Sequence, residues 1–323
     1  MNETTVKPSS TTHVVVGAGT VGAHLAGLLT DAGHDVVVVT RSVTAAPDSR
    51  VRRVAIDAAD TDALLAAVPN AVAIYNCVNP PYHQWEQQWP PLARSFERYA
   101  EVTGAVLVTC SNLYGYGPVD SPMTESVPLA ATGTKGRVRA AMWAQAKALH
   151  DAGRIRTTEV RGSDYLAAGT QSRLGDRVVP RLIAGKKVQL AGSLDQPHTW
   201  TSPLDVARLM VIVASDRQAW GRAWHVPSHE PRTQRQVVRD LATAIAVPDF
   251  TVTSVPKALL WMVGLVNPVV RGLRETGYQM ERPYILDDTA ARTTFAMQPS
   301  PWNEIVAATV APYDTATKVA VPT

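Results

Sequence analysis

The chain has 323 residues, of which 46% are hydrophobic and 18% are charged, with a formal net charge of +3. This balance is typical of a folded globular protein and excludes an intrinsically disordered chain. The Lys and Arg residues are dispersed rather than gathered into a basic block, which argues against nucleic acid as a partner. Length alone allows one large domain or two smaller ones.

The two cysteines and the apolar runs bear on compartment and metal binding. Cys77 and Cys110 fall in apolar runs that predict buried strands, so neither a disulfide framework nor a zinc site is indicated. Residues 1–12 are polar and lack the apolar core of a signal peptide. The apolar stretch over residues 258–266 is much shorter than a membrane span. We therefore expect a cytoplasmic protein with no metal and no membrane partner.

The first half of the chain alternates short β-branched runs with amphipathic segments of helical length. This alternation predicts an α/β protein with a Rossmann-type, doubly wound parallel sheet covered by helices on both faces. The expected strands cover residues 13–17, 35–40, 51–56, 71–78, 105–110 and 156–161, and the expected helices cover 21–32, 60–67, 85–102 and 136–152.

After residue 162 the pattern is less regular, which indicates a second and smaller C-terminal lobe. Residues 255–284, rich in Pro, Gly, Trp and Arg, predict helical pieces joined by loops. The other expected elements are a strand at residues 223–226 and helices at 175–184, 204–214, 234–246 and 304–311.

A glycine-rich loop, VVVGAGTVG, interrupts the first strand–helix unit. Gly17, Gly19 and Gly22 form G-x-G-x-x-G, with Thr20 and Val21 at the start of the helix. In this context the glycines permit a tight turn, close approach of the backbone to a diphosphate, and close packing of helix on strand. The helix N-terminus adds free N–H groups for the phosphates. The loop predicts dinucleotide binding, and the alternative is a strand-to-helix turn without a ligand.

The residues at the ends of the next strands suggest which dinucleotide is bound. The second strand ends in Thr40, Arg41 and Ser42, where NAD-binding folds usually carry an acidic residue. A guanidinium beside hydroxyls suits a 2′-phosphate, so NADP(H) is favoured and NAD(H) is the alternative. Arg41 could instead be an ordinary solvated residue. Asp57 either accepts the adenine amino group or caps the following helix, and Asn79 is a further candidate for cofactor contact.

Several motifs together carry a family resemblance. They are VVGAGTVG, VLVTCSNLYGYGP, Met123-Thr124-Glu125, Lys135, EVRGSDYLAAG and QPHTWTSPLDVARLM. From about residue 12 to residue 310 the chain resembles the extended short-chain dehydrogenase/reductase superfamily, in its NAD-dependent epimerase/dehydratase group. The resemblance is to atypical members, in which the cofactor cradle is kept and the acid/base residues differ.

The resemblance implies a catalytic Ser, a proton-transferring Tyr, and a Lys four residues after the Tyr that holds the nicotinamide ribose and lowers the Tyr pKa. Lys135 matches the Lys at the start of a helix, but Ala131 stands at the Tyr position and has no proton to give. The Ser position falls on Cys110, with Ser111 one residue later. The usual tyrosine mechanism therefore cannot operate from this position.

Other residues could supply the missing acid. Tyr114 and Tyr116 follow the fifth strand, and Tyr82 and His83 follow the fourth, at the edge of the sheet where ligands bind in this architecture. Histidine has a pKa suited to proton transfer near neutrality. Lys135 could also take this role if burial lowers its pKa. The alternative is that the tyrosines pack over turns and the histidine is a loop residue.

The resemblance also implies two domains. The dinucleotide-binding domain would span residues 12–170 with about 198–228, and the substrate-binding lobe 171–197 and 229–315, with flexible tails at 1–11 and 316–323. Relatives dimerise through the helices expected at 85–102 and 136–152, so a homodimer through them is one prediction; the alternative is that the small-residue face of the second helix packs against a neighbour within the chain. Polar and aromatic residues in stretches that would line the cleft are Arg161, Tyr165, Arg173, His198, Trp200, Trp261, Arg271, Arg274 and Tyr278. Taken singly, each is better explained as a surface arginine or a core aromatic.

Three functions follow from this set of residues. The first is an NADP-dependent oxidoreductase that reduces a carbonyl or oxidises an alcohol of a small organic substrate, with the protein orienting cofactor and substrate. The second is an epimerase, dehydratase, isomerase or cyclase on the same fold, without net redox change. The third is a non-catalytic regulator that senses the dinucleotide.

Overall fold

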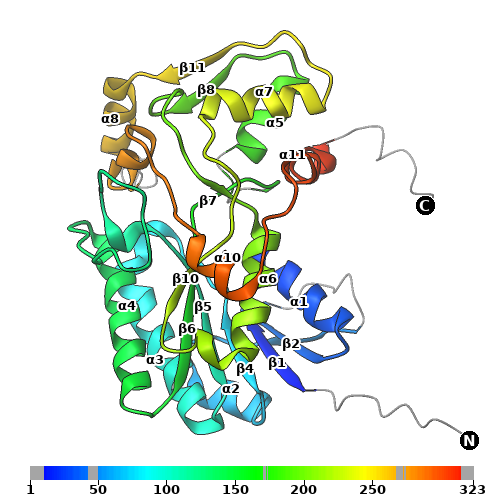
Figure 1. The fold of residues 1–323 in the computed structure, drawn as a ribbon, viewed down its shortest axis with the longest axis vertical. Coiled ribbons are helices and arrows are strands. Elements are labelled where there is room, and N and C mark those ends of the chain that lie inside the picture. The colour runs from blue at the N-terminus through cyan, green and yellow to red at the C-terminus, as the bar shows by residue number, and fades with distance from the viewer. Residues whose placement is uncertain are drawn as a thin grey trace, which may run out of the picture.

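The computed structural model describes residues 11–42, 50–169, 172, 174–266, 272 and 274–313. A seven-stranded sheet, with every neighbouring pair parallel, forms the base of the molecule (Figure 1). In spatial order β10-β6-β5-β4-β1-β2-β3, the strand order reverses direction between β1 and β4, and such a switch point opens a crevice at the carboxyl ends of the strands. The strands are β1 (Thr12–Val16), β2 (Asp35–Thr40), β3 (Arg52–Ala55), β4 (Ala73–Asn76), β5 (Val106–Asn112), β6 (Arg156–Gly162) and β10 (Ala223–His225).

Helices cover both faces of this sheet (Figure 1). On one face, α1 (Thr20–Asp31) and α6 (Pro203–Ser215) bury a core that includes Leu25, Met210 and Trp224. On the other face, α2 (Thr61–Ala67), α3 (Trp85–Thr103) and α4 (Thr134–Asp151) cover a core rich in aromatic side chains. The α/β fold class predicted from the sequence is confirmed. The strands are nearly continuous apolar runs because helices bury them on both faces.

The second lobe has a core of its own. Helices α5 (Gly175–Ile183), α7 (Gln234–Ala244) and α11 (Trp302–Val310) pack around a two-stranded parallel sheet of β8 (Val188–Ala191) and β11 (Val252–Val255). Helix α8 (Lys257–Val266) lies at the side of this lobe (Figure 1). The lobes are linked by β7 (Asp164–Tyr165), which pairs with β9 (Trp200–Thr201), and by α10 (Thr289–Phe295), which packs back onto β10.

Short 3-10 turns carry several of the candidate residues. They are η1 (Tyr82–Gln84), η2 (Tyr114–Tyr116), η3 (Arg217–Ala219), η4 (Gly277–Met280) and η5 (Ala311–Tyr313). The first two follow β4 and β5, so they lie at the carboxyl edge of the large sheet, as the sequence predicted for the segments that contain them.

The expected elements of the first half are present with small shifts at their ends, whereas the sequence missed β7, β8, β9, β11 and α10. These strands have two to four residues and gain stability only from their partners, so they leave little periodicity to detect. Among the described residues, no helix is long and apolar enough to cross a membrane, and no group of three His, Cys, Asp or Glu is arranged to bind a metal. Both cysteines are free thiols. The expected tails, Thr11 apart, lie outside the described residues.

Candidate functional site

The glycine loop between β1 and α1 is closely packed against the backbone around it. Gly17 has a φ of +101°, and its N–H donates to the carbonyl of Val39 at 2.9 Å. A Cβ on Gly17 would lie 2.7 Å from the carbonyl oxygen of Cys77, and a Cβ on Gly22 would lie 2.0 Å from the carbonyl oxygen of Gly17. Both positions therefore require glycine, since the obstructing atoms belong to the main chain.

The N-terminus of α1 suits a diphosphate. Gly19 is the N-cap and offers no side-chain cap, and the first turn, which contains Thr20 and Val21, has no acidic residue. Gly19 is exposed, whereas Val21 is buried and fixes the start of the helix in the core. An exposed, uncapped helix N-terminus presents N–H donors and the positive end of the helix dipole to an anion. The residues present thus fit the diphosphate of a dinucleotide.

The end of β2 places Arg41 and Ser42, both exposed, two and three residues beyond the contact of Val39 with Gly17. The Thr40 hydroxyl donates to the carbonyl of Ser42 at 2.8 Å, which shapes this turn. The Arg41 guanidinium is therefore on the same edge of the sheet as the glycine loop. A phosphate on the 2′ oxygen of an adenosine ribose is the kind of anion that a guanidinium binds bidentately there.

The Asp57 carboxylate accepts a hydrogen bond from the N–H of Ala59 at 3.0 Å and so shapes the turn before α2. The cap of α2 is Asp60, which accepts from the N–H of Ala63 at 3.0 Å, so the alternative of Asp57 as that cap is wrong. Asp57 and Asn79 are both exposed, after β3 and β4 respectively. They remain predictions as cofactor contacts.

At the carboxyl end of β5, Cys110 and Ser111 lie next to the cleft region of the sheet. The Cys110 sulfur is 3.3 Å from the hydroxyl of Tyr165, and burial raises the pKa of both groups. The Ser111 side chain is buried, and Ser111 pairs in register with Arg161 of β6. The thiol is therefore held as a neutral hydrogen-bonding group rather than a reactive thiolate.

Tyr116 belongs to a buried polar network beneath this edge. Its hydroxyl lies 2.7 Å from Nε2 of His225 and accepts a hydrogen bond from Nη1 of Arg161 at 2.7 Å. Since Nδ1 of His225 lies 2.8 Å from the carbonyl oxygen of Asp287, we assign the imidazole hydrogen to Nδ1, which leaves Nε2 to accept from Tyr116. Burial raises the pKa of Tyr116 to about 12 and lowers that of His225.

We expect Tyr116→Phe to lower the free energy of unfolding by about 1–3 kcal/mol, because it leaves the buried Nη1 of Arg161 and Nε2 of His225 without their partner. Chemical denaturation measures this change. Tyr99→Phe is the matched control, since the Tyr99 hydroxyl is also buried but contacts main-chain groups, at the carbonyl of Val68 at 2.5 Å and at Ala71, rather than a charged side chain, and should cost less. Unchanged stability with lost turnover would instead assign Tyr116 to catalysis.

Tyr114 and Tyr82 bring two hydroxyl groups together above α3. Their oxygens are 2.9 Å apart, and the Tyr114 ring stacks on Trp85 with ring centroids 6.0 Å apart. The Lys135 ammonium lies 5.7 Å from the centroid of the Tyr82 ring. His83, by contrast, is exposed in η1. The structure thus brings Tyr82, Tyr114 and Lys135 together and places His83 at the surface.

Lys135 is the second residue of α4, and its side chain is only 5% exposed. Its ammonium donates to Oε2 of Glu275 at 3.0 Å and to the carbonyl of Gly272 at 2.8 Å, while its backbone N–H donates to Oε1 of Glu275 at 2.6 Å. Glu275 therefore neutralises the lysine and places a carboxylate at the N-terminus of α4, where the helix dipole favours an anion.

Sequence reasoning missed Glu275 because 140 residues separate it from Lys135. One nearby sign of this carboxylate in the sequence is Gly133. A Cβ there would lie 2.4 Å from Oε1 of Glu275, so only glycine leaves room for the carboxylate. Ala131 precedes α4 and packs against Gly136, where an added Cβ would lie 2.2 Å from the Ala131 Cβ.

A pocket of about 190 Å³ opens beside Ala131, between the two lobes. A larger cavity of about 410 Å³ lies wholly in the second lobe and shares no residue with it. Of the second-lobe residues expected to line the cleft, Tyr278 lines this pocket, whereas Trp261 is exposed on α8, and Arg173 and Arg271 lie outside the described residues. The pocket is lined by Tyr114, Gly117, Pro118, Ala131, Thr132, Gly133, Gly136, Glu275, Thr276 and Tyr278.

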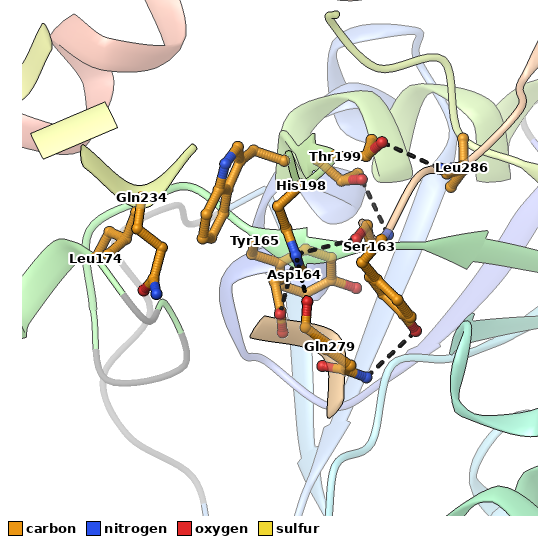
Figure 2. A network of polar contacts seen from close by, with 12 residues as sticks. Ser163, Asp164, Tyr165, Leu174, His198, Thr199, Gln234, Gln279 and Leu286 are labelled. Atoms are coloured by element: carbon orange, nitrogen blue, oxygen red, sulfur yellow. Dashed lines mark hydrogen bonds and ion pairs between the residues drawn. The ribbon is translucent and has the colours of Figure 1, made fainter. Parts of the chain in front are cut away.

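A second buried network fixes the lobes to each other (Figure 2). Nε2 of His198 lies 3.2 Å from Oδ2 of Asp164 and 3.5 Å from Oγ of Ser163, and Nδ1 lies 3.2 Å from the carbonyl oxygen of Gln279. His198 lies just before β9, and its imidazole contacts Asp164 of β7 and Gln279 of η4. It thereby connects these three elements. This network holds the segment that carries Glu275 and Tyr278 in place over α4.

A switch-point crevice, a glycine loop that admits no Cβ and an uncapped α1 together define a Rossmann-type dinucleotide-binding protein. The chain belongs to the NAD-dependent epimerase/dehydratase family, whose family model matches residues 13–226. The resemblance drawn from the motifs is thus confirmed, and this family depends on nicotinamide dinucleotides. No curated protein matches the chain.

Solved structures share the fold at low sequence identity. The dTDP-glucose 4,6-dehydratase of Bacillus anthracis, in complex with NAD, has a TM-score of 0.74 at 16% identity, over 96% of this chain and 98% of that one. UDP-glucose 4-epimerase of Thermotoga maritima, with UDP-glucose, has a TM-score of 0.75 at 14% identity, over 95% and 99%. UDP-glucuronic acid 4-epimerase of Bacillus cereus, in complex with NAD, has a TM-score of 0.72 at 15% identity, over 96% and 97%.

Proposed function

We propose that the chain is an NADP-dependent oxidoreductase that acts on an alcohol or carbonyl carbon of a small organic molecule. The observation that carries this proposal is the β1–α1 loop, where Gly17 and Gly22 are sterically required and the helix N-terminus is uncapped. When bound, a nicotinamide dinucleotide supplies hydride transfer. The loop would hold the diphosphate, Arg41 and Ser42 the 2′-phosphate, and Lys135 the nicotinamide ribose.

Proton transfer needs a residue other than the one at position 131. Ala131 lines the pocket but has no ionisable group, so the proton must come from a neighbouring side chain. Glu275, Tyr114 and Tyr278 are the ionisable groups among the described residues that line it. Burial raises the pKa of Tyr278 to about 12, which suits a hydrogen-bond donor better than a base.

A second candidate is an epimerase or dehydratase that uses the dinucleotide without net turnover. The family to which the chain belongs and the names of the solved structures with the same fold favour it. A dinucleotide-sensing regulator is the third candidate, and the replacement of the tyrosine by Ala131 is the observation that favours it.

The three candidates differ in what happens to the dinucleotide. The protein is incubated with NADPH or NADP and a panel of small alcohols and carbonyl compounds, while absorbance follows the reduced nicotinamide and chromatography follows the organic compounds. Net cofactor turnover supports the oxidoreductase. Conversion of a compound without net turnover supports the epimerase or dehydratase, and binding without either supports the regulator. Calorimetry that detects no binding of any nicotinamide dinucleotide would exclude all three.

We expect Arg41→Asp to shift the preference from NADP to NAD by about tenfold or more, because the substitution removes a phosphate-binding cation and adds a repelling carboxylate. Calorimetric titration with both dinucleotides measures the ratio of the dissociation constants. Arg217→Asp, an equal change of charge at the exposed η3, should leave the ratio unchanged. An unchanged ratio in the Arg41 variant would mean that the phosphate is bound elsewhere.

A further inference from the structure

The pocket beside Ala131 exists because the residues around it are small. Gly117, Gly133, Gly136 and Ala131 contribute no side chain beyond a Cβ. Gly117 has a φ of +73°, and at Gly133 and Gly136 an added Cβ would lie within 2.5 Å of existing atoms. The space at the N-terminus of α4 therefore depends on residues that cannot be enlarged without displacing Glu275, Ala131 or the main chain.

The pocket wall offers hydrogen-bond acceptors from one carboxylate, which is ion-paired with a lysine outside the lining. Glu275 carries the formal charge among the described lining residues, and no Lys or Arg is among them. The Lys135 ammonium, although near, is directed to Glu275 and to the carbonyl of Gly272. Each carboxylate oxygen has two lone pairs and accepts one hydrogen bond from Lys135, so each can accept one more. A ligand with a hydroxyl donor is therefore favoured over a carboxylate ligand, which has no proton to donate to Glu275.

The size and the other walls restrict the body of the ligand. Pockets for drug-sized ligands usually measure roughly 300–1,000 Å³. At about 190 Å³ this pocket cannot enclose a whole sugar nucleotide, such as the UDP-glucose in the epimerase structure. Tyr114, Pro118 and Tyr278 also line the space, and residues of this kind offer apolar contact to a flat or compact group.

We infer that this pocket binds the substrate of the proposed reaction, that the substrate is a small uncharged alcohol with an aromatic or apolar body, and that Glu275 accepts the hydrogen bond of its hydroxyl. The inference rests on the proposed function in that it calls the bound alcohol a substrate. Binding of the alcohol to the pocket does not itself require a dinucleotide. It sets this chain apart from the sugar-nucleotide enzymes whose fold it shares.

Equilibrium binding of benzyl alcohol tests the inference, with ligand-observed NMR and calorimetry as the two measurements. Benzoate has the same ring with a negative charge, and UDP-glucose has the large anionic group. The variants are Ala131→Leu, which fills the pocket, Glu275→Gln, which removes the charge, and Gly133→Ala, which displaces the carboxylate at a backbone conformation that alanine tolerates. Ala66→Leu, on the exposed side of α2, is the control for Ala131→Leu.

The wild type and Ala66→Leu should bind benzyl alcohol about tenfold or more tightly than benzoate, and Ala131→Leu should lose about tenfold in affinity for benzyl alcohol. Glu275→Gln and Gly133→Ala should both reduce the difference in binding affinity between benzyl alcohol and benzoate. Thermal melting verifies that each variant is folded, and the two independent Glu275 perturbations keep the test valid if one of them unfolds.

Benzyl alcohol that fails to bind the wild type, binds Ala131→Leu equally well, or binds no better than benzoate would overturn the inference. Saturable binding of UDP-glucose that Ala131→Leu abolishes would also overturn it. Failure of the proposed function is a separate result, since it appears as absent dinucleotide binding while binding of the alcohol to the pocket persists.

Discussion

Gly22→Ala is expected to weaken dinucleotide binding by about a hundredfold and to lower the free energy of unfolding by about 1–3 kcal/mol. The added Cβ would lie 2.0 Å from the carbonyl oxygen of Gly17, so α1 must move away from the loop that approaches the diphosphate. Calorimetric titration with NADP and NAD, together with chemical denaturation, measures the two effects.

Gly27→Ala is the matched control in the same helix. An added Cβ at Gly27 would meet no heavy atom within 4 Å, so this substitution should stabilise the protein by about 0.5–1 kcal/mol through helix propensity and leave binding unchanged. If both variants bind dinucleotides like the wild type, the β1–α1 loop is not the cofactor cradle.

Lys135→Ala is expected to reduce dinucleotide affinity or turnover by about tenfold or more. The substitution removes the ammonium from a buried position and leaves Oε2 of Glu275 and the Gly272 carbonyl without this donor, so the proposed ribose contact and one of the two hydrogen bonds that hold Glu275 are lost. Titration with both dinucleotides and the alcohol and carbonyl panel provide the measurements.

Lys147→Ala controls for the loss of a lysine from α4, because Lys147 is on the same helix and pairs with Asp151 at 2.6 Å at the surface. Surface pairs of this kind contribute little to stability, so this variant should behave like the wild type. An unchanged Lys135→Ala variant would remove Lys135 from the site.

The cofactor half of the site could be predicted because its signals are local. Strand β1, the three glycines of the loop and helix α1 follow one another within about twenty residues, and each leaves a pattern that short-range geometry dictates. The positions of Arg41 after β2 and of Lys135 at the start of α4 could be predicted in the same way, while their roles as cofactor contacts stay predictions. Whether the cofactor is NADP and whether a homodimer forms through α3 and α4 stay predictions.

The catalytic half could be predicted only in part. The replacement of the motif tyrosine by Ala131 is visible in the sequence, but the residues that surround the vacated position come from both lobes. Tyr114 and Tyr116 are two positions apart, yet their hydroxyl groups have different partners. The Tyr116 hydroxyl is hydrogen-bonded to a buried arginine and a histidine, whereas the Tyr114 hydroxyl is hydrogen-bonded to Tyr82. The direction in which each side chain leaves η2 decides this, and no spacing rule encodes it.

The sequence by itself determined the parallel sheet, the glycine loop and the family, since apolar runs and glycines act through contacts with neighbours close along the chain. Only the tertiary structure decided that Glu275 pairs with Lys135, that Gly133 makes room for Glu275, and that Tyr278 lines the pocket beside Ala131. The physical reason is that an ion pair between residues 140 positions apart depends on how two separately packed cores come together, which local patterns do not record.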